Sequence, residues 1–350
     1  MNELDNARAE FRDRLIAEGL LIPTGVDGLY GRSGTFEDII DGIDGVVRRT
    51  GRSVYGTDGA KRLRFPPVFP RTSFEKTDYI ASFPQLTGAI STFLGDNKEH
   101  RALLADRDEG RPWDGHLASA GTMLVSAACH PLYNTISGEL PDGGSRFDVY
   151  GYCFRHEPAI DPARMQAFRM HEYVYVGDPD SAAAHRDSWI PRGLDVLTSL
   201  GLKPEAVPAN DPFFGRAGRL LATNQIEENL KTELVVRLYG DLDDGTAVVS
   251  CNCHREHFGE NFAIHTADGE VAHSACVGFG MERIALALLT NHGTTISQWP
   301  ADVLNELGSA GSSRHNRRRR RRRCSRRCRL GGTFCYICSC GGVRSRGSVG

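Results

Sequence analysis

Side chains with complementary chemistry lie close together in the segment 149–176, VYGYCFRHEPAIDPARMQAFRMHEYVYV. Arg155 and Glu157 are two residues apart at the end of one predicted strand, and Phe168 and Glu172 lie on the returning strand. Residues an even number apart in a strand share a face. An arginine can clamp a phosphate, a glutamate can accept from an adenine amino group, and an aromatic ring can stack on the base. The segment therefore suits an adenylated ligand, and an amphipathic hairpin with its charges in water explains it equally well.

A second segment, CVGFGMERIALALL over 276–289, predicts a glycine-rich strand that runs into an apolar helix. Its G-x-G glycines permit a close backbone approach. Ile284 and Leu288 recur at helical spacing and would bury the helix against a sheet. Arg283 falls in the first helical turn, where the helix dipole favours anions rather than cations. The sequence therefore predicts that a bound anion holds Arg283.

Three metal-binding side chains lie on or beside strands next to these motifs. Cys129 ends a strand predicted over 122–129, Glu172 shares a face with Phe168, and Cys276 comes two residues before the glycine turn. A catalytic zinc takes three nitrogen, sulfur or oxygen ligands and keeps one position open. Three unrelated residues are the alternative, because free cysteine is commonly buried.

A rival group lies within the segment 246–264, which predicts two strands around a histidine-rich turn. Strand alternation sends neighbouring side chains to opposite faces of a sheet. We therefore do not expect this group to bind a metal. Its members are Cys251, Cys253, His254 and His257.

Further elements must position these residues. The sequence predicts helices over 2–21, 35–48 and 187–202, with Thr35 as the cap of the second. An extended, proline-bearing segment follows over 64–70. No repeat interrupts this mixture of helices and strands, which favours an antiparallel sheet flanked by helices.

The F-R-x-E hairpin and the later G-x-G-x-E-R sequence resemble motifs two and three of the class II aminoacyl-tRNA synthetases. The helix over 35–48 and the segment over 64–70 resemble motif one, which builds the dimer interface, although a proline-rich loop fits the segment as well. The resemblance implies an α+β fold with an antiparallel sheet flanked by helices, and a homodimer.

Over roughly residues 35–305 the chain resembles the atypical seryl-tRNA synthetases of methanogens, whose Cys-Glu-Cys zinc captures the amino group of the amino acid. The phrases FPPVFPRTSFEKTDYIASFPQLTGAI, CFRHEP and SCNCHREHFGENF look more like their truncated homologues, the amino acid:[carrier protein] ligases. That resemblance implies ATP-dependent activation of a small amino acid, such as glycine or alanine, and its transfer to the phosphopantetheine thiol of a carrier protein. A true seryl-tRNA synthetase and a non-catalytic regulator are the alternatives.

The resemblance also implies roles for individual residues. Arg155 would clamp the α-phosphate and Arg283 the γ-phosphate, both as catalytic residues. Glu157 would read the adenine amine and Phe168 would stack on the base. Zinc on the triad would hold the amino group, so that Glu172 and Arg155 also contact the amino acid. The triad is Cys129, Glu172 and Cys276, and the other expected ATP contacts are Arg164, Met165, Lys231, Ala247, Val248, Val249 and Ser250.

Magnesium is expected with ATP. Seryl synthetases place a magnesium-binding glutamate shortly before a Ser-x-Ser-Asn segment, and residues 246–252 contain none. Glu233 is the candidate, with a solvent-facing strand residue as the alternative. With only about 35 residues before the core, no tRNA-binding domain is expected, and hence no tRNA partner.

Charge divides the chain at Gly308. The whole chain carries a formal net charge of −2, and the thirteen arginines after Gly308 leave −15 on residues 1–308. A body this acidic repels phosphate backbones, and it would also repel an acidic carrier protein. We expect a catalytic domain over 1–308, with residues 1–34 as a helical lead-in.

The tail over 309–350 has seven consecutive arginines and five cysteines. It could be a basic arm for nucleic acid or membrane, a zinc knuckle with poor C-x2-C-x-C spacing, or translation in a wrong frame. We favour a disordered or misframed tail without function. The chain has no run of 18 apolar residues and its N-terminus lacks an apolar signal core. A cytoplasmic protein without a membrane partner is expected.

Overall fold

The computed structural model describes residues 2–211, 228 and 230–308. The chain divides after Gly308, and the first unit, Met1–Gly308, is compact. The expectations for the arginine- and cysteine-rich tail lie outside the described residues. Among the described helices, none combines the length and the apolar character that crossing a bilayer requires.

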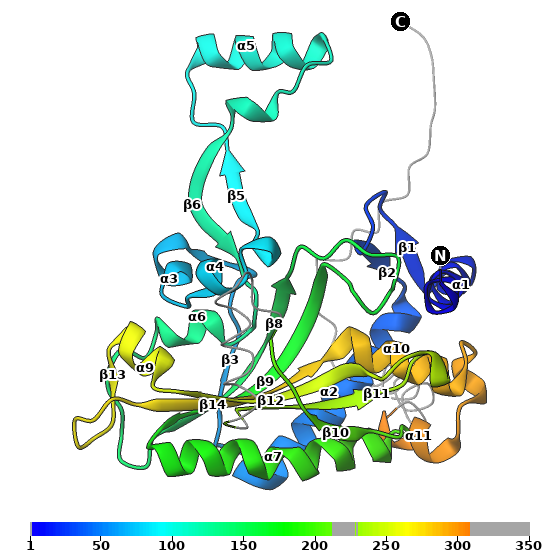
Figure 1. Cartoon of the computed structure of the whole chain (residues 1–350), viewed down its shortest axis with the longest axis vertical. Helices are drawn as coiled ribbons and strands as arrows, with labels where there is room; N and C mark the ends of the chain where they lie inside the picture. The colour runs from blue at the N-terminus through cyan, green and yellow to red at the C-terminus, as the bar shows by residue number, and fades with distance from the viewer. Residues whose placement is uncertain (1, 212–227, 229, 309–350) are drawn as a thin grey trace, which may run out of the picture. The chain divides into compact units, whose positions relative to one another are not determined.

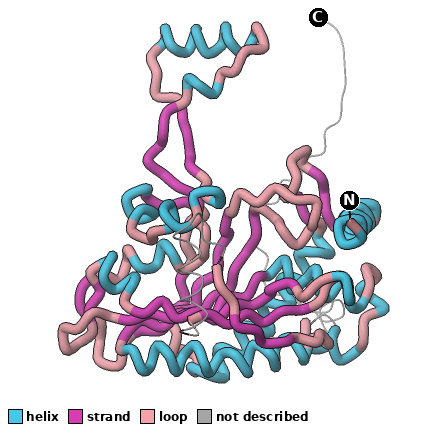
Figure 2. Tube along the Cα trace, viewed as in Figure 1, coloured by secondary structure: helices cyan, strands magenta, loops and turns pink. Residues whose placement is uncertain are grey.

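A seven-stranded sheet forms the centre of the first unit (Figures 1 and 2). Its neighbouring strands are antiparallel, except that the edge strand β3 pairs with β8 in parallel. This confirms the predicted α+β fold with a mainly antiparallel sheet. In spatial order the strands are β10 (Glu205–Pro208), β11 (Lys231–Val236), β12 (Thr246–Arg255), β14 (His273–Gly280), β9 (Ala167–Gly177), β8 (Ser145–Phe154) and β3 (Lys61–Leu63).

Three helices cover one face of this sheet: α2 (Gly34–Tyr55), α7 (Pro179–Ser199) and α10 (Met281–His292). Their apolar residues join the inner residues of β12 and β14 in the largest hydrophobic cluster. Two helices extend that layer, α1 (Glu3–Ala17) and α11 (Ala301–Glu306). Because this layer is continuous and apolar, it fixes the sheet while leaving its other face free for a site.

The opposite face is only partly covered. The short helices α6 (His130–Tyr133) and α9 (His257–Phe262) pack there in a second cluster. The β1–β2 hairpin (Leu21–Pro23, Tyr30–Arg32) hydrogen-bonds to the β8–β9 loop through the backbone of Gly28 and Gln166. Smaller elements complete this side: α3 (Arg71–Glu75), α4 (Tyr79–Ser82), β7 (Gly138–Glu139) and β13 (Ile264–His265).

A three-stranded sheet carries an arm beside the main sheet. Its order is β4 (Val68–Pro70), β6 (Ala118–Leu124) and β5 (Ala89–Thr92). The β5 and β6 strands lead to α5 (Asn97–Asp108), which stands clear of the main sheet in Figure 1. This helix buries no residue, and a capping box between Asp96 and Glu99 defines its start.

Several predicted boundaries were wrong for local reasons. The strand expected over 122–129 ends at Leu124, and Cys129 instead precedes α6, whose first turn contains Pro131. The second strand expected within 246–264 is replaced by the helix α9. Ser33, not Thr35, caps α2 by accepting the Phe36 N–H.

Helix lengths also differ from the expectation. The first helix ends at Ala17 rather than near residue 21, and α2 continues to Tyr55. The helix predicted over 187–202 begins at Pro179, after an Asp178 cap. An Asp cap followed by Pro is a common signal for the start of a helix. The internal Pro191 interrupts the helical pattern and so obscured this earlier start.

Candidate active site

One cavity of about 480 Å³ occupies the open face of the main sheet. It is bounded by the β8–β9 loop, strands β9, β11, β12 and β14, the start of α10, and the segment around α4. Thirteen of the fourteen predicted site residues line it, and the exception is Arg164, which is exposed. The thirteen are Cys129, Arg155, Glu157, Met165, Phe168, Glu172, Lys231, Ala247, Val248, Val249, Ser250, Cys276 and Arg283.

Successive side chains of strand β9 point alternately into the cavity and toward the helical layer. Phe168, Met170 and Glu172 line the cavity. Arg169 and His171 point the other way, where Arg169 forms an ion pair with Glu37 of α2 and His171 Nδ1 lies 2.8 Å from Asp44 Oδ1 of the same helix. The shared face predicted for Phe168 and Glu172 is therefore present, and the intervening residues anchor the strand to the helices.

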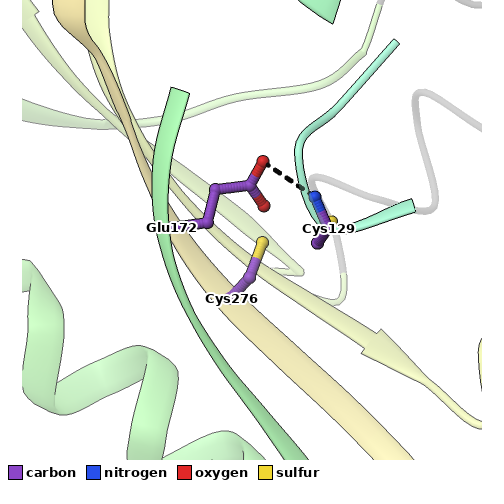
Figure 3. A group of neighbouring side chains, drawn as sticks. All are labelled: Cys129, Glu172 and Cys276. Atoms are coloured by element: carbon purple, nitrogen blue, oxygen red, sulfur yellow. Dashed lines mark hydrogen bonds between the residues drawn. The ribbon is translucent and has the colours of Figure 1, made fainter. Parts of the chain in front are cut away.

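Cys129, Glu172 and Cys276 line this cavity and point toward one another (Figure 3). Their ligand atoms all lie within 4.8 Å of one another, and each side chain is at most 4% exposed. The backbone N–H of Cys129 donates to Glu172 Oε1 at 3.3 Å. Two sulfurs and a carboxylate match the donors that zinc accepts. The three residues thus fit a three-ligand metal site whose remaining position faces the cavity.

Burial and mutual contact shift the acidities of the triad. Burial, followed by the charge of Cys276, raises the pKa of Glu172 to about 7. Hydrogen bonding to Cys276 and burial raise the pKa of Cys129, whereas the Cys129 contact lowers the pKa of Cys276 against the effect of burial. A divalent cation would relieve this crowding of acidic groups.

The rival group of cysteines and histidines does not form a separate metal site among the described residues. Cys251 faces the helical layer. Cys253, His254 and His257 line the cavity, and His254 Nε2 lies 3.6 Å from Cys276 Sγ. The alternation argument failed at His254, because β12 has a bulge between Cys253 and Arg255.

Two arginines face the cavity without a carboxylate partner within ion-pair distance among the described residues. Arg155 Nε donates to the Ser126 carbonyl at 3.2 Å, and its guanidinium lies 5.5 Å from the centre of the Phe168 ring. Arg283 donates to the carbonyls of Ala163 and Ala247 at 2.9 and 3.0 Å. Burial and the charge of Arg155 lower the pKa of Arg283. Both groups are therefore suited to bind an anion.

The other predicted nucleotide contacts differ in their surroundings. Arg164 lies on the β8–β9 loop, 3.6 Å from Glu157. Lys231 is buried and forms ion pairs with Asp211 and, at 3.0 Å, with Glu233. A phosphate contact by Lys231 stays a prediction, since two carboxylates already neutralise this lysine.

The comparisons with known proteins identify the family. No family model matches the chain. The chain is 41% identical over 295 residues to amino acid--[acyl-carrier-protein] ligase 1 of Bradyrhizobium diazoefficiens, covering 84% of this chain and 89% of that protein. The chain belongs to the amino acid--[acyl-carrier-protein] ligase family. Ligase 2 of the same organism is 39% identical and is covered to 88%. The predicted resemblance is confirmed.

More distant matches agree with the fold. Type-2 serine--tRNA ligase of Methanopyrus kandleri is 28% identical over 204 residues, which span 55% of this chain and 38% of that protein. M. kandleri SerRS in complex with A. aeolicus tRNASec superposes with a TM-score of 0.72 at 20% identity, over 86% of this chain and 60% of that one. The cytoplasmic serine-tRNA ligase of Naegleria fowleri in complex with AMP gives 0.62 at 14% identity, with 85% and 59% coverage. These structures confirm the class II synthetase fold.

In this ligase, one further group positions the site, and the sequence reasoning missed it. Glu282 is 1% exposed and accepts from the backbone N–H and Nε of Arg169, at 2.6 and 2.8 Å. Arg169 also forms two hydrogen bonds with Glu37 of α2. Glu282 precedes Arg283 in the G-x-G-x-E-R motif, which was the available signal. The network locks the start of α10 against β9 and so fixes where Arg283 lies.

Proposed function

We propose that this ligase uses ATP to activate a small amino acid, glycine or alanine, as its adenylate and transfers it to the phosphopantetheine thiol of a carrier protein. The names of the two Bradyrhizobium relatives support the carrier protein as acceptor. The observation that carries the proposal is the convergence of Cys129, Glu172 and Cys276 in the same cavity as Arg155 and Arg283.

The chain's own residues would act by positioning and by neutralising charge. Arg155 would hold the α-phosphate beside the amino acid carboxylate, and Arg283 would hold the γ-phosphate. Phe168 would stack on the adenine, and Glu157 would accept from its amino group. Met165, Lys231 and residues 247–250 line the same cavity, and Arg164 lies beside Glu157 at its edge.

Cys129, Glu172 and Cys276 would hold zinc, which when bound supplies a Lewis acid that captures the substrate amine. The buried donor set fits this ion, because two soft thiols and one carboxylate face a single point. Glu172 would thereby orient the amino acid as well. Magnesium would accompany ATP, with Glu233 as a candidate ligand at the cavity wall.

The proposal extends to the organisation of the protein. Residues 1–308 would be the catalytic domain, with residues 1–34 as its lead-in, and residues 309–350 would have no part in catalysis. The ligase would act as a homodimer in the cytoplasm, and tRNA would not be its acceptor.

Amino-acid-dependent ATP–pyrophosphate exchange tests the activation step. The twenty amino acids are compared while zinc is measured in the same sample. We expect exchange with glycine or alanine and one zinc per chain. Radiolabelled amino acid should then become attached to a holo carrier protein but not to its apo form, which lacks the thiol. Absence of exchange with all twenty would contradict the proposal.

Type-2 serine--tRNA ligase activity is the second candidate, because those proteins match half of the chain. A tRNA charging assay with serine separates the two functions. Exchange with serine alone, followed by charging of tRNA, would identify tRNA and not a carrier protein as the acceptor.

A further inference from the structure

His254 occupies an irregular position on β12. In the pairing of β12 with β14, Cys253 lies opposite Ala275 and Arg255 lies opposite Ser274, which leaves His254 as the extra residue of a bulge. Arg255 completes the irregularity with a left-handed φ of 52°. Bulges re-aim side chains and are frequent beside active sites. Here the bulge lets both Cys253 and His254 face the cavity.

Both nitrogens of the His254 ring have partners on β14. Nε2 lies 3.6 Å from Cys276 Sγ, and Nδ1 lies 3.2 Å from the hydroxyl of the buried Ser274. A cysteine that binds a metal does so as the thiolate, which can only accept a hydrogen bond. Nε2 must therefore carry the proton and donate it toward sulfur.

Asn252 supplies a second donor to the same sulfur. Its Nδ2 lies 3.5 Å from Cys276 Sγ. The Ser250 hydroxyl donates to Asn252 Oδ1 at 2.9 Å, which orients the amide. Cys129 has no comparable side-chain donor from β12 among the described residues. The two thiols of the triad are thus held differently.

We propose that His254 is a positioning residue of the metal site, which fixes the sulfur of Cys276 as a ligand through the Nε2–H hydrogen bond. This inference rests on the proposed function, since it presupposes zinc on the triad. Partners of this kind orient metal ligands, and their loss typically lowers metal affinity about 10- to 100-fold.

His257 offers a matched control in the same cavity. Both histidine rings meet Phe258 edge-on, at centroid distances of 5.0 Å for His254 and 4.9 Å for His257. His257 Nε2, however, contacts the Thr77 carbonyl at 3.3 Å, and it has no sulfur partner within the described part of the chain. Replacing either ring by phenylalanine keeps an aromatic group beside Phe258, and only His254→Phe removes a donor to Cys276.

The experiment measures zinc affinity of the full chain by competition with a chromophoric chelator. We expect His254→Phe to bind zinc about 10- to 100-fold more weakly, and His257→Phe to bind like the wild type. His254→Gln retains an N–H donor and should recover most of the affinity. Thermal melts of the four proteins identify any variant that fails to fold.

Cobalt substitution adds a readout that general destabilisation would not move. A hydrogen bond lowers the energy of the thiolate lone pairs, so its loss should shift the sulfur-to-cobalt absorption band of His254→Phe to longer wavelength. An unchanged affinity and spectrum for His254→Phe would overturn the inference, as would an equal loss in His257→Phe. If the wild type binds no zinc, the metal site of the proposed function fails together with it.

Discussion

Arg155 and Arg283 bring two positive charges into one cavity. Arg155 donates to one backbone carbonyl and Arg283 to two, and these contacts orient each guanidinium without neutralising it. Burial, and after it the charge of Arg155, lowers the pKa of Arg283, so the proximity of the two cations is unfavourable by itself. A polyphosphate between them would turn this repulsion into binding energy.

Arg283→Ala should reduce ATP–pyrophosphate exchange by at least about 100-fold, because one charge-stabilising group of the transition state is lost. Steady-state exchange measures the effect. Arg71→Ala is the control, since Arg71 is exposed and paired with Glu75 on α3. Comparable losses in both variants would remove the assigned role of Arg283.

Cys129→Ala should abolish stoichiometric zinc binding, because only two ligands remain. Cys153→Ala removes another buried cysteine from the same hydrophobic cluster, outside the triad. It should keep one zinc per chain. Metal analysis after gel filtration checks both variants, and full zinc content in Cys129→Ala would exclude this residue as a ligand.

At the scale of residues, the sequence was informative where a motif defined the surroundings. The F-R-x-E and G-x-G-x-E-R segments were sufficient to bring Arg155 and Arg283 to one cavity. His254 could not be predicted, because its orientation depends on a bulge that alternation does not anticipate. Glu282 stands inside a recognised motif at the start of α10, but its partner Arg169 reaches it from strand β9.

At the scale of elements, the packing of α2 against β9 depends on a missing side chain. A Cβ at Gly51 would clash with the ring of Tyr173, which is buried and stacks on Trp189 at 4.8 Å. A Cβ at Gly45, on the same helix, would meet nothing closer than the Arg49 guanidinium at 3.5 Å. The two glycines therefore have different roles within one helix.

Gly51→Ala should destabilise the protein by about 1–3 kcal/mol through overpacking. Gly45→Ala should stabilise it by up to about 1 kcal/mol, because alanine is the better helix former. Urea denaturation of both variants measures the free energies of unfolding. Equal effects of the same sign would show that helix propensity, and not the contact with Tyr173, decides the outcome.

Asp148 of β8 links the edge strand to the centre of the sheet. It is 5% exposed and lies 3.1 Å from Arg64 and 3.2 Å from His171. Burial raises the pKa of this carboxyl, but His171 and Arg64 outweigh burial and lower it overall. A lowered pKa means that the carboxylate stabilises the fold above its unfolded pKa of about 3.9 and less as the pH falls further.

Asp148→Asn should therefore lower the free energy of unfolding by about 1–3 kcal/mol at pH 7. The difference from the wild type should stay constant down to about pH 5 and shrink below about pH 4. Urea titrations over this range measure it. A difference that persists unchanged at pH 3 would mean that the lost contact is not ionic.

The element boundaries show where local signals suffice. The strand β14 and helix α10 follow directly from glycines and apolar periodicity. The strand expected to end at Cys129 was wrong because the run TMLVSAAC is apolar throughout, and such a run does not reveal where a strand gives way to a turn. The backbone of Val125 instead bonds to Pro67 and Phe154, both distant in sequence.

At the scale of the whole molecule, the charge of the chain changes sign at Gly308. Residues 1–308 carry a net charge of −15 and form a compact unit by themselves. The thirteen arginines that follow offset most of this charge in the whole chain.

A chain ending at Gly308 should retain ATP–pyrophosphate exchange within about twofold, because every predicted site residue precedes that point. Any salt-dependent binding of nucleic acid by the full chain should be lost. Exchange assays and filter binding at two salt concentrations compare the two chains. A truncated chain that folds but has lost exchange would assign the tail a part in catalysis.

The strands that carry Glu172 and Cys276 are neighbours joined by their own backbone hydrogen bonds, and Cys129 is tied to Glu172 through its N–H. The scaffold is therefore assembled whether or not an ion arrives. If the triad binds zinc as proposed, removing the metal should therefore leave the chain folded but inactive.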